Sequence, residues 1–176
     1  MTGTRILLVG MMGAGKTTIG RAIATRTGWQ YLDNDELVQR LTGRTAPELA
    51  AEGEQVLREV EAGAMRAAIE LPPPVVAGIA GGVVLDPANR EKLMAAREVV
   101  WLRASHQTLT RRVGTGEGRA WLRPDPATAI ERLAAAREPY YQQVADLIVD
   151  VDGKAPGAIA REVLAGVSGV PDETVS

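Results

Sequence analysis

Several residue types that support common kinds of protein site are missing or scarce in this chain. Its 176 residues include no cysteine, no phenylalanine and one histidine, His106. Without thiols the chain can form neither a disulfide framework nor a thiolate metal site, and one histidine cannot build a zinc centre. Aromatic residues make up 3% of the chain, so its core must be packed mainly from aliphatic side chains.

Charge and apolar runs exclude two further classes of partner. The formal net charge is −2 at pH 7, whereas a general nucleic-acid binder relies on a basic surface. The N-terminal apolar run is too short for the core of a signal peptide, and no apolar stretch reaches membrane-spanning length. We therefore expect a cytoplasmic protein that binds neither nucleic acid nor membranes. We also expect a monomer.

The most specific motif is Gly-Met-Met-Gly-Ala-Gly-Lys-Thr at residues 10–17, which directly follows the apolar run Ile6 to Val9. It fits the pattern G-x-x-x-x-G-K-[ST], in which glycines let backbone N–H groups converge on a phosphate at a helix N-terminus. In that pattern Lys16 reaches the β- and γ-phosphates, and the Thr17 hydroxyl ligates Mg²⁺. The motif predicts nucleotide binding.

Short apolar runs alternate with helical patterns along the whole chain, which is typical of a parallel sheet built from strand-helix-strand units. We predict a three-layer α/β/α fold of the P-loop NTPase type, with five parallel strands. The expected strands are Arg5–Val9, Gln30–Leu32, Val75–Ile79, Val99–Leu102 and Leu147–Val149. The first helix should span Lys16–Thr27, and further helices should begin after Thr45, Asp86, Ser105 and Asp125, which have the spacing of capping residues.

Asp33 and Asp35 come directly after the second predicted strand, at the sheet edge that also carries the phosphate-binding loop. Residues two apart in an extended segment face the same way, so both carboxylates can point into one cleft. One would support Mg²⁺ and the other would hold a hydroxyl group. The alternative is that Asp33 simply caps the following helix.

Two arginines occupy positions where a charge needs a partner. Glu61 falls within the apolar stripe of its helix, and Arg58, three residues earlier, can pair with it and aim its guanidinium at a ligand. An exposed ion pair is the alternative. Arg137 lies on the same helix face as Ile130, which favours contact with an anion, either a protein carboxylate or a substrate.

Two glycine-rich segments complete the candidate site. Residues 114–119 resemble a mobile loop, from which Arg119 could neutralise charge on a transferred phosphoryl group or simply lie in solvent. Ala80-Gly81-Gly82 follows the third strand and lets the backbone approach a ligand closely, or makes a plain turn. We expect His106 to lie at the surface or serve packing rather than catalysis.

In order and spacing, these segments resemble the shikimate kinases, small P-loop enzymes related to nucleoside-monophosphate kinases. The resemblance covers about Arg5 to Leu164. Its components are the loop at 10–17, Asp33-Asn34-Asp35, Thr42-Gly43-Arg44, Gly53-Glu54 with Arg58 and Glu61, Gly81-Gly82, Arg111-Arg112, Arg119 to Leu122, Arg137 to Tyr141, and Asp152 to Pro156.

The resemblance implies that ATP, with Mg²⁺, phosphorylates the 3-hydroxyl of shikimate in the pathway to the aromatic amino acids. It implies a single kinase domain (1–165), with a substrate-binding region at 33–70 and a lid at 114–124. Residues 166–176 lack apolar periodicity, so we expect them to form a flexible tail. The catalytic residues would be Lys16, Asp35 and Arg119. ATP would contact Gly13, Ala14, Gly15, Lys16, Thr17, Thr18, Arg112, Lys154 and Pro156; shikimate would contact Asp35, Arg58, Gly81, Gly82 and Arg137; the metal would be held by Thr17 and Asp33.

The departures from the family pattern lie near the acceptor. Ala80 stands where a third glycine is usual, Ala50 and Leu57 stand where phenylalanine is common, and Ala120 replaces a proline of the lid. They leave open a kinase of a related cyclitol or of a hydroxy acid such as gluconate. A nucleotide switch without an acceptor is a third hypothesis, although the chain lacks the N-K-x-D motif of a guanine-specific switch.

Overall fold

Five strands form a single parallel sheet in the order β2-β3-β1-β4-β5. This computed structural model describes residues 4–114, 124–168 and 170. The strands are β1 (Arg5–Val9), β2 (Gln30–Leu32), β3 (Val75–Gly78), β4 (Val99–Arg103) and β5 (Leu147–Asp150). The predicted five-stranded parallel sheet is therefore confirmed.

Three strand ends differ by one residue from the prediction. β3 ends at Gly78 rather than Ile79, where the chain turns toward the glycine pair. β4 and β5 each include one more residue, Arg103 and Asp150, which face each other in the sheet and form a bidentate ion pair. The apolar pattern of the sequence could not predict Arg103 and Asp150 as strand residues, because a salt bridge rather than burial extends the two strands.

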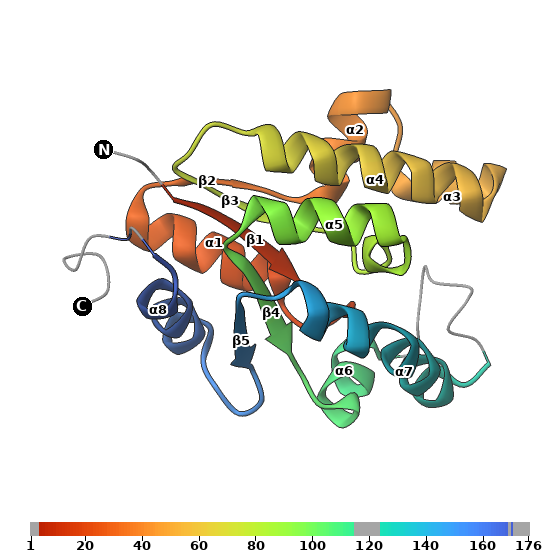
Figure 1. Cartoon of the computed structure of the whole chain (residues 1–176). Helices are drawn as coiled ribbons and strands as arrows, with labels where there is room; N and C mark the ends of the chain where they lie inside the picture. Colours follow the sequence, from red (N-terminus) through yellow and green to blue (C-terminus); the bar gives the residue numbers. More distant parts are fainter. Residues whose placement is uncertain (1–3, 115–123, 169, 171–176) are drawn as a thin grey trace.

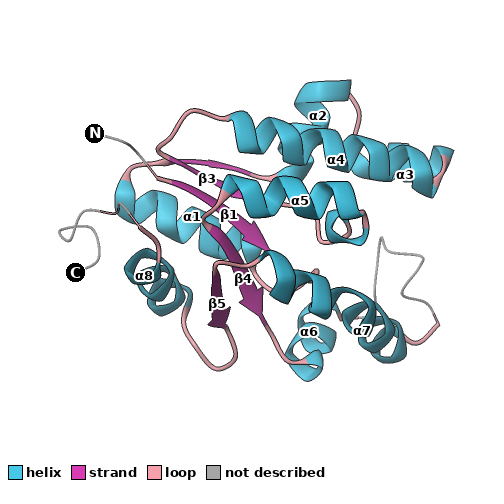
Figure 2. Ribbon diagram, viewed as in Figure 1, coloured by secondary structure: helices cyan, strands magenta, loops and turns pink. Residues whose placement is uncertain are grey.

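Helices cover both faces of the sheet, which confirms the three-layer architecture (Figures 1 and 2). α1 (Lys16–Thr27) and α8 (Pro156–Gly166) pack together on one face; α4 (Glu54–Glu70), α5 (Pro87–Ala96) and α7 (Pro126–Val144) cover the other. The shorter elements are α2 (Asn34–Thr42), α3 (Ala46–Glu52), the 3₁₀ helix η1 (Val83–Leu85) and α6 (His106–Val113).

Local capping determines where four of these helices begin. Thr45 forms a capping box with Glu48 at α3, and Asp86, Ser105 and Asp125 accept hydrogen bonds from the first turns of α5, α6 and α7. The predicted helix starts are confirmed, because a side chain that caps a helix satisfies backbone donors within three residues of itself.

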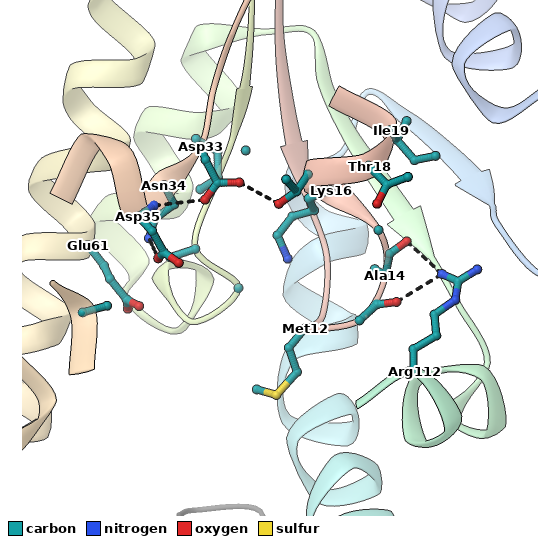
Figure 3. A pocket seen from close by; sticks show the side chains of 18 of the residues that line it. Met12, Ala14, Lys16, Thr18, Ile19, Asp33, Asn34, Asp35, Glu61 and Arg112 are labelled. Carbon is teal, nitrogen blue, oxygen red and sulfur yellow. Dashed lines mark hydrogen bonds between the residues drawn. The ribbon is translucent and has the colours of Figure 1, made fainter. Parts of the chain in front are cut away.

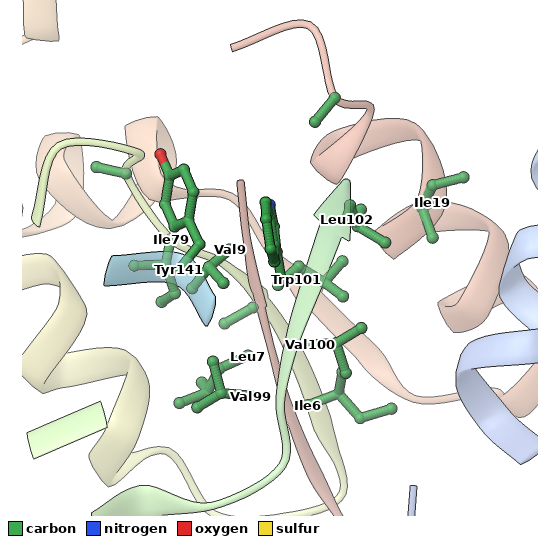
Figure 4. Packing of buried hydrophobic residues seen from close by; sticks show 14 of the residues in the cluster. Ile6, Leu7, Val9, Ile19, Ile79, Val99, Val100, Trp101, Leu102 and Tyr141 are labelled. Carbon is green, nitrogen blue, oxygen red and sulfur yellow. The ribbon is translucent and has the colours of Figure 1, made fainter. Parts of the chain in front are cut away.

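The aliphatic core fills both sides of the central strands (Figure 4). Leu7, Val99 and Trp101 face the layer of α4, α5 and α7, in which the ring of buried Tyr141 lies 5.8 Å from that of Trp101. Ile6 and Leu102 face the layer of α1 on the other side. This packing holds β1 and β4 rigidly, and with them the loops that leave their carboxyl ends.

The chain ends show two further features. No helix among the described segments is long and apolar enough to cross a membrane. At the start of the segment predicted to be a flexible tail, Val167 is buried and the backbone N–H of Ser168 lies 3.3 Å from Glu98 Oε1. The last residues of that segment, 171–176, lie outside the described part of the chain.

Candidate active site

A cleft of about 880 Å³ opens at the carboxyl edge of the sheet. It is lined by the phosphate-binding loop, the segment 33–35, α3 and α4, the turn after β3, and parts of α6, α7 and the β5–α8 loop. Of the predicted site residues that the structure describes, all but Gly82 line this cleft. Arg119, with most of the predicted lid, lies outside the described residues.

The phosphate-binding loop has a backbone that requires glycine. Gly13 and Gly15 have φ angles of 80° and 99°, a region that residues with a side chain rarely adopt. Gly15 precedes the first residue of α1, Lys16, whose ammonium donates to the carbonyl oxygens of Gly10 at 2.7 Å and Met11 at 3.1 Å. The loop thus brings a cation and the N-terminus of a helix to one point, as phosphate binding requires.

Arg112 holds this loop from the side of α6. Its Nη1 donates to the carbonyl oxygens of Gly13 at 3.1 Å and Ala14 at 3.4 Å (Figure 3). Lys154 and Pro156 line the same end of the cleft, and the Lys154 ammonium pairs with Glu162 at 2.6 Å. Arg112, Lys154 and Pro156, which were predicted to contact ATP, therefore line one cleft although they come from two separate parts of the chain.

The Asp33 carboxylate caps α2, which was the alternative from the sequence, and it also contacts the phosphate-binding loop. Its Oδ1 accepts a hydrogen bond from the backbone N–H of Asp35 at 3.1 Å and so caps α2. Its Oδ2 accepts one from the Thr17 hydroxyl at 2.6 Å. Burial raises the pKa of Asp33, but the hydrogen bonds from Thr17 and Tyr31 outweigh burial and hold that pKa below its ordinary value. The group is therefore an anion at neutral pH.

The opposite end of the cleft carries two arginines and a buried carboxylate. Arg58 Nη1 lies 2.9 Å from Glu61 Oε2, and Arg58 Nη2 lies 3.2 Å from the exposed Glu54. Glu61 is 9% exposed and Arg137 is 5% exposed. Burial raises the pKa of Glu61, and the charge of Arg58 offsets this only in part. Glu61 thus orients Arg58, as one of the two alternatives from the sequence proposed.

Arg137 has a hydrogen-bonding group that the protein leaves unused. Its Nε is buried and has no hydrogen-bond partner among the residues that the structure describes. An unsatisfied buried donor on a cation is costly. Since Arg137 also lines the cleft, an anionic ligand there would compensate the buried charge of its guanidinium.

The turn at Gly81 and Gly82 is contacted by side chains from α4 and α7, the helices that carry Arg58 and Arg137. The Tyr141 hydroxyl donates to the Gly81 carbonyl oxygen at 2.7 Å. A Cβ built on Gly81 would lie 2.9 Å from that hydroxyl, and one built on Gly82 would overlap the guanidinium of Arg58. Gly82 therefore does not line the cleft. Because it has no side chain, the Arg58 guanidinium can occupy the space beside it.

Three residues of the cleft region were not predicted as site residues. Glu61 was noticed only as a partner of Arg58, although a carboxylate within an apolar stripe is itself a signal. Tyr31 donates its hydroxyl hydrogen to Asp33 Oδ2 at 2.8 Å, and Tyr141 donates its own to the Gly81 carbonyl oxygen. No sequence pattern marks either tyrosine, because each one's partner is defined by the fold. His106 is exposed and lies 3.3 Å from Glu138, outside the cleft lining.

Across the cleft these groups define two halves. Lys16 lies between Asp35 on one side and Ala14 with Arg112 on the other, and Glu61 lies beyond Asp35 (Figure 3). One half carries the phosphate-binding loop, and the other carries Arg58, Glu61 and Arg137. Asp35 lies where the two halves meet.

Comparison with known proteins agrees with this geometry. A sequence model of the shikimate kinase family matches residues 12–168. A shikimate kinase of Moorella thermoacetica is 40% identical over 159 residues, covering 90% of this chain and 91% of that protein. The solved structure of the Acinetobacter baumannii shikimate kinase in complex with shikimate has a TM-score of 0.85 at 32% identity, covering 93% of this chain and 92% of that one.

A gluconokinase structure from Sinorhizobium meliloti is also similar, with a TM-score of 0.62 at 22% identity. The match covers 94% of this chain and 91% of the gluconokinase chain. That likeness concerns the fold alone. The resemblance to the shikimate kinases is confirmed by the family match over most of the chain. The chain therefore belongs to the shikimate kinase family.

Proposed function

We propose that this protein transfers the γ-phosphoryl group of ATP to the 3-hydroxyl of shikimate, giving shikimate 3-phosphate and ADP. The observation that supports this most directly is the buried Arg137, whose Nε lacks a partner among the described residues, in the same cleft as the phosphate-binding loop. A compact acid with a ring hydroxyl fits between these two features. We infer that the enzyme acts as a cytoplasmic monomer in the pathway to the aromatic amino acids.

The acceptor is held at its carboxylate in this proposal. Arg58 and Arg137 both line the cleft, and a planar guanidinium matches a carboxylate with paired hydrogen bonds. Glu61 keeps Arg58 oriented, and Gly81 offers its backbone at the ring. Two guanidinium groups at one carboxylate favour an anionic acceptor over a neutral sugar.

Asp35 would then act on the reacting hydroxyl. Its carboxylate accepts the hydroxyl proton as the acceptor oxygen attacks the γ-phosphorus, while the bond to the bridging oxygen of ADP breaks. Lys16 would neutralise charge that develops on the phosphates, and Arg119, outside the described residues, would do so from the lid. The enzyme contributes mainly alignment and charge neutralisation.

The metal would be held by the Thr17 hydroxyl oxygen, and Asp33 would support it through a water. Both present oxygen atoms, the donors that Mg²⁺ prefers, and the two side chains lie 2.6 Å apart at the phosphate-binding loop. The described residues contain no cluster of three or more acidic or histidine side chains suited to a metal, which fits an ion that arrives largely coordinated by phosphates and water. When bound, Mg²⁺ would neutralise the charge of the β- and γ-phosphates.

The test is ATP turnover in a coupled assay with and without shikimate. We expect ADP formation to depend on shikimate, and gluconate or other hydroxy acids to give far lower rates. Absence of a shikimate-dependent rate would overturn the proposal, and a faster rate with another hydroxy acid would reassign the acceptor.

The residue assignment has its own variants. Asp35→Asn should lower kcat by roughly 100-fold or more, the size of effect expected for a lost general base. Glu36→Gln makes the same carboxylate-to-amide change on the neighbouring, exposed residue of α2 and should retain wild-type kcat. Equal rates for Asp35→Asn and wild type would remove Asp35 from the mechanism.

A further inference from the structure

Tyr31 places a hydroxyl group on the carboxylate that supports the phosphate-binding loop. It lies in β2, two residues before Asp33, so its side chain leaves the strand on the same side. The Tyr31 hydroxyl donates to Asp33 Oδ2 at 2.8 Å, and the Thr17 hydroxyl donates to the same oxygen at 2.6 Å. Tyr31, Asp33 and Thr17 thus form a three-membered hydrogen-bonded chain that ends at the candidate metal site.

The fold leaves a slot for this tyrosine. A Cβ built on Gly20 of α1 would overlap the Tyr31 ring, and one built on Gly78 of β3 would lie 2.8 Å from the Tyr31 hydroxyl oxygen. Two glycines from different elements therefore make room for the ring and for its hydroxyl. Burial and the neighbouring Asp33 raise the pKa of Tyr31, so the group stays protonated and donates.

Asp33 has little hydrogen-bonding capacity left over. A carboxylate oxygen offers about two lone-pair directions, and Oδ2 accepts from both Thr17 and Tyr31. Oδ1 accepts from the backbone N–H of Asp35. The carboxylate is therefore held at both ends in one orientation, in which it receives the Thr17 proton.

That orientation determines what Thr17 offers to the cleft. A hydroxyl that donates its hydrogen to one neighbour directs its lone pairs elsewhere, and Thr17 lines the cleft beside the phosphate-binding loop. If Asp33 turned, the Thr17 hydroxyl could rotate and present its hydrogen instead. Tyr31 opposes that turn by holding Oδ2.

We propose that Tyr31 is a positioning residue of the magnesium site: it holds Asp33 as the acceptor of the Thr17 hydroxyl, so that the Thr17 oxygen is presented to the cation. This inference rests on the proposed function, in which Mg²⁺ accompanies the nucleotide. Loss of a hydrogen bond behind a metal ligand typically costs 10- to 100-fold in metal affinity or activity.

The test is calorimetric binding of ADP, measured with saturating Mg²⁺ and with EDTA, and it needs no turnover. The affinity for ADP with Mg²⁺ divided by the affinity with EDTA gives a ratio that reports the metal site alone. Tyr31→Phe should lower the ratio about 10-fold relative to wild type, while ADP affinity in EDTA stays the same. Tyr140→Phe deletes the same atom from a tyrosine of α7 that packs under Arg90, 4.1 Å from its ring, and should keep the wild-type ratio.

A second variant tests the same hydrogen bond with the tyrosine present. Gly78→Ala places a methyl group against the Tyr31 hydroxyl and should lower the ratio as Tyr31→Phe does. Because the ratio is taken within one protein, partial unfolding, which weakens both affinities alike, does not change it.

The outcomes separate this inference from the function on which it rests. An unchanged or larger ratio in Tyr31→Phe, or equal weakening with Mg²⁺ and with EDTA, would overturn the role of Tyr31 alone. Wild-type protein whose ADP affinity ignores Mg²⁺ would overturn the metal site of the proposed function as well. Shikimate-dependent turnover by wild type, measured separately, shows whether the kinase assignment itself stands.

Discussion

The guanidinium of Arg58 occupies the space beside Gly82 that any larger residue there would need. A Cβ built on Gly82 would lie 2.7 Å from Arg58 Cζ, well inside van der Waals contact, and still closer to Nη1. Arg58 is also held from its own helix by Glu61. The glycine turn after β3 and the helix α4 therefore specify the position of this guanidinium together.

Gly82→Ala should displace Arg58 and impair acceptor binding. We expect kcat/KM for shikimate to fall by about 10- to 100-fold, because misplacing a binding group by about an ångström has effects of this size, and KM for ATP to change little. Steady-state kinetics with each substrate varied would measure both. Gly63→Ala on α4 is the control, because its Cβ would meet only ordinary contacts, 3.7 Å from Arg66 and 4.0 Å from Leu41. A wild-type KM for shikimate in Gly82→Ala would contradict the prediction.

Arg137→Lys should raise KM for shikimate selectively. The substitution keeps the charge but removes the planar guanidinium, and a hydrogen bond to a charged group is worth roughly 1.5–3 kcal/mol. That corresponds to an increase of about 10- to 100-fold. Arg132→Lys makes the same change on the exposed side of α7 and should leave KM unchanged. Equal effects of Arg137→Lys on ATP and shikimate would argue against a carboxylate at Arg137.

Arg112→Ala should weaken nucleotide binding. It removes the hydrogen bonds to the carbonyl oxygens of Gly13 and Ala14 and one wall of the cleft. We expect KM for ATP to rise about 10-fold, the value of one charged hydrogen bond, with KM for shikimate unchanged. Arg111→Ala is the matched control on the same helix. The opposite pattern, a selective effect on shikimate, would place Arg112 on the acceptor side.

Glu61 should make stability depend on pH with a definite sign. Burial raises its pKa above the ordinary 4.5, so the folded protein binds the Glu61 proton more tightly than the unfolded chain does. The stabilisation that this proton contributes is present at low pH and is lost as pH rises through the raised pKa. The free energy of unfolding of wild type, relative to Glu61→Gln, should therefore fall as pH rises above about 4.5.

Urea unfolding of both proteins across that pH range measures the difference. Glu59→Gln, an exposed change on the same helix, should show no such trend. If the difference between wild type and Glu61→Gln instead grew with pH, the ion pair with Arg58 would outweigh burial, and the pKa of Glu61 would be lowered.

Much of the fold is predictable because its signals are local. Strands such as β1 and β4 are buried on both faces and read as unbroken apolar runs. Caps such as Asp86 and Asp125 bond to N–H groups within three residues. The phosphate-binding loop needs its glycines, Lys16 and Thr17 at one spacing. Each of these features is determined by residues that are close to one another in the sequence.

The candidate site was predictable only in part. The structure brings most of the predicted residues to one cleft, and the resemblance to the family brought the more distant ones, Arg137 and Lys154, into one proposal. The competing roles of Asp33 could not be separated, because the carboxylate has two oxygens and only the fold shows that each has its own partner.

The amino-acid sequence by itself determined the strands to within one residue, the starts of the capped helices, the nucleotide-binding loop and the set of charged residues available for catalysis. Only the tertiary structure decided how those residues hold one another: Gly82 makes room for Arg58, Tyr141 holds the Gly81 carbonyl, 60 residues away, and Tyr31 steadies Asp33 in a slot between Gly20 and Gly78. The reason is physical. Each of these arrangements depends on hydrogen-bond directions and on space left by glycines in separate elements, which exist only once the sheet has brought those elements together.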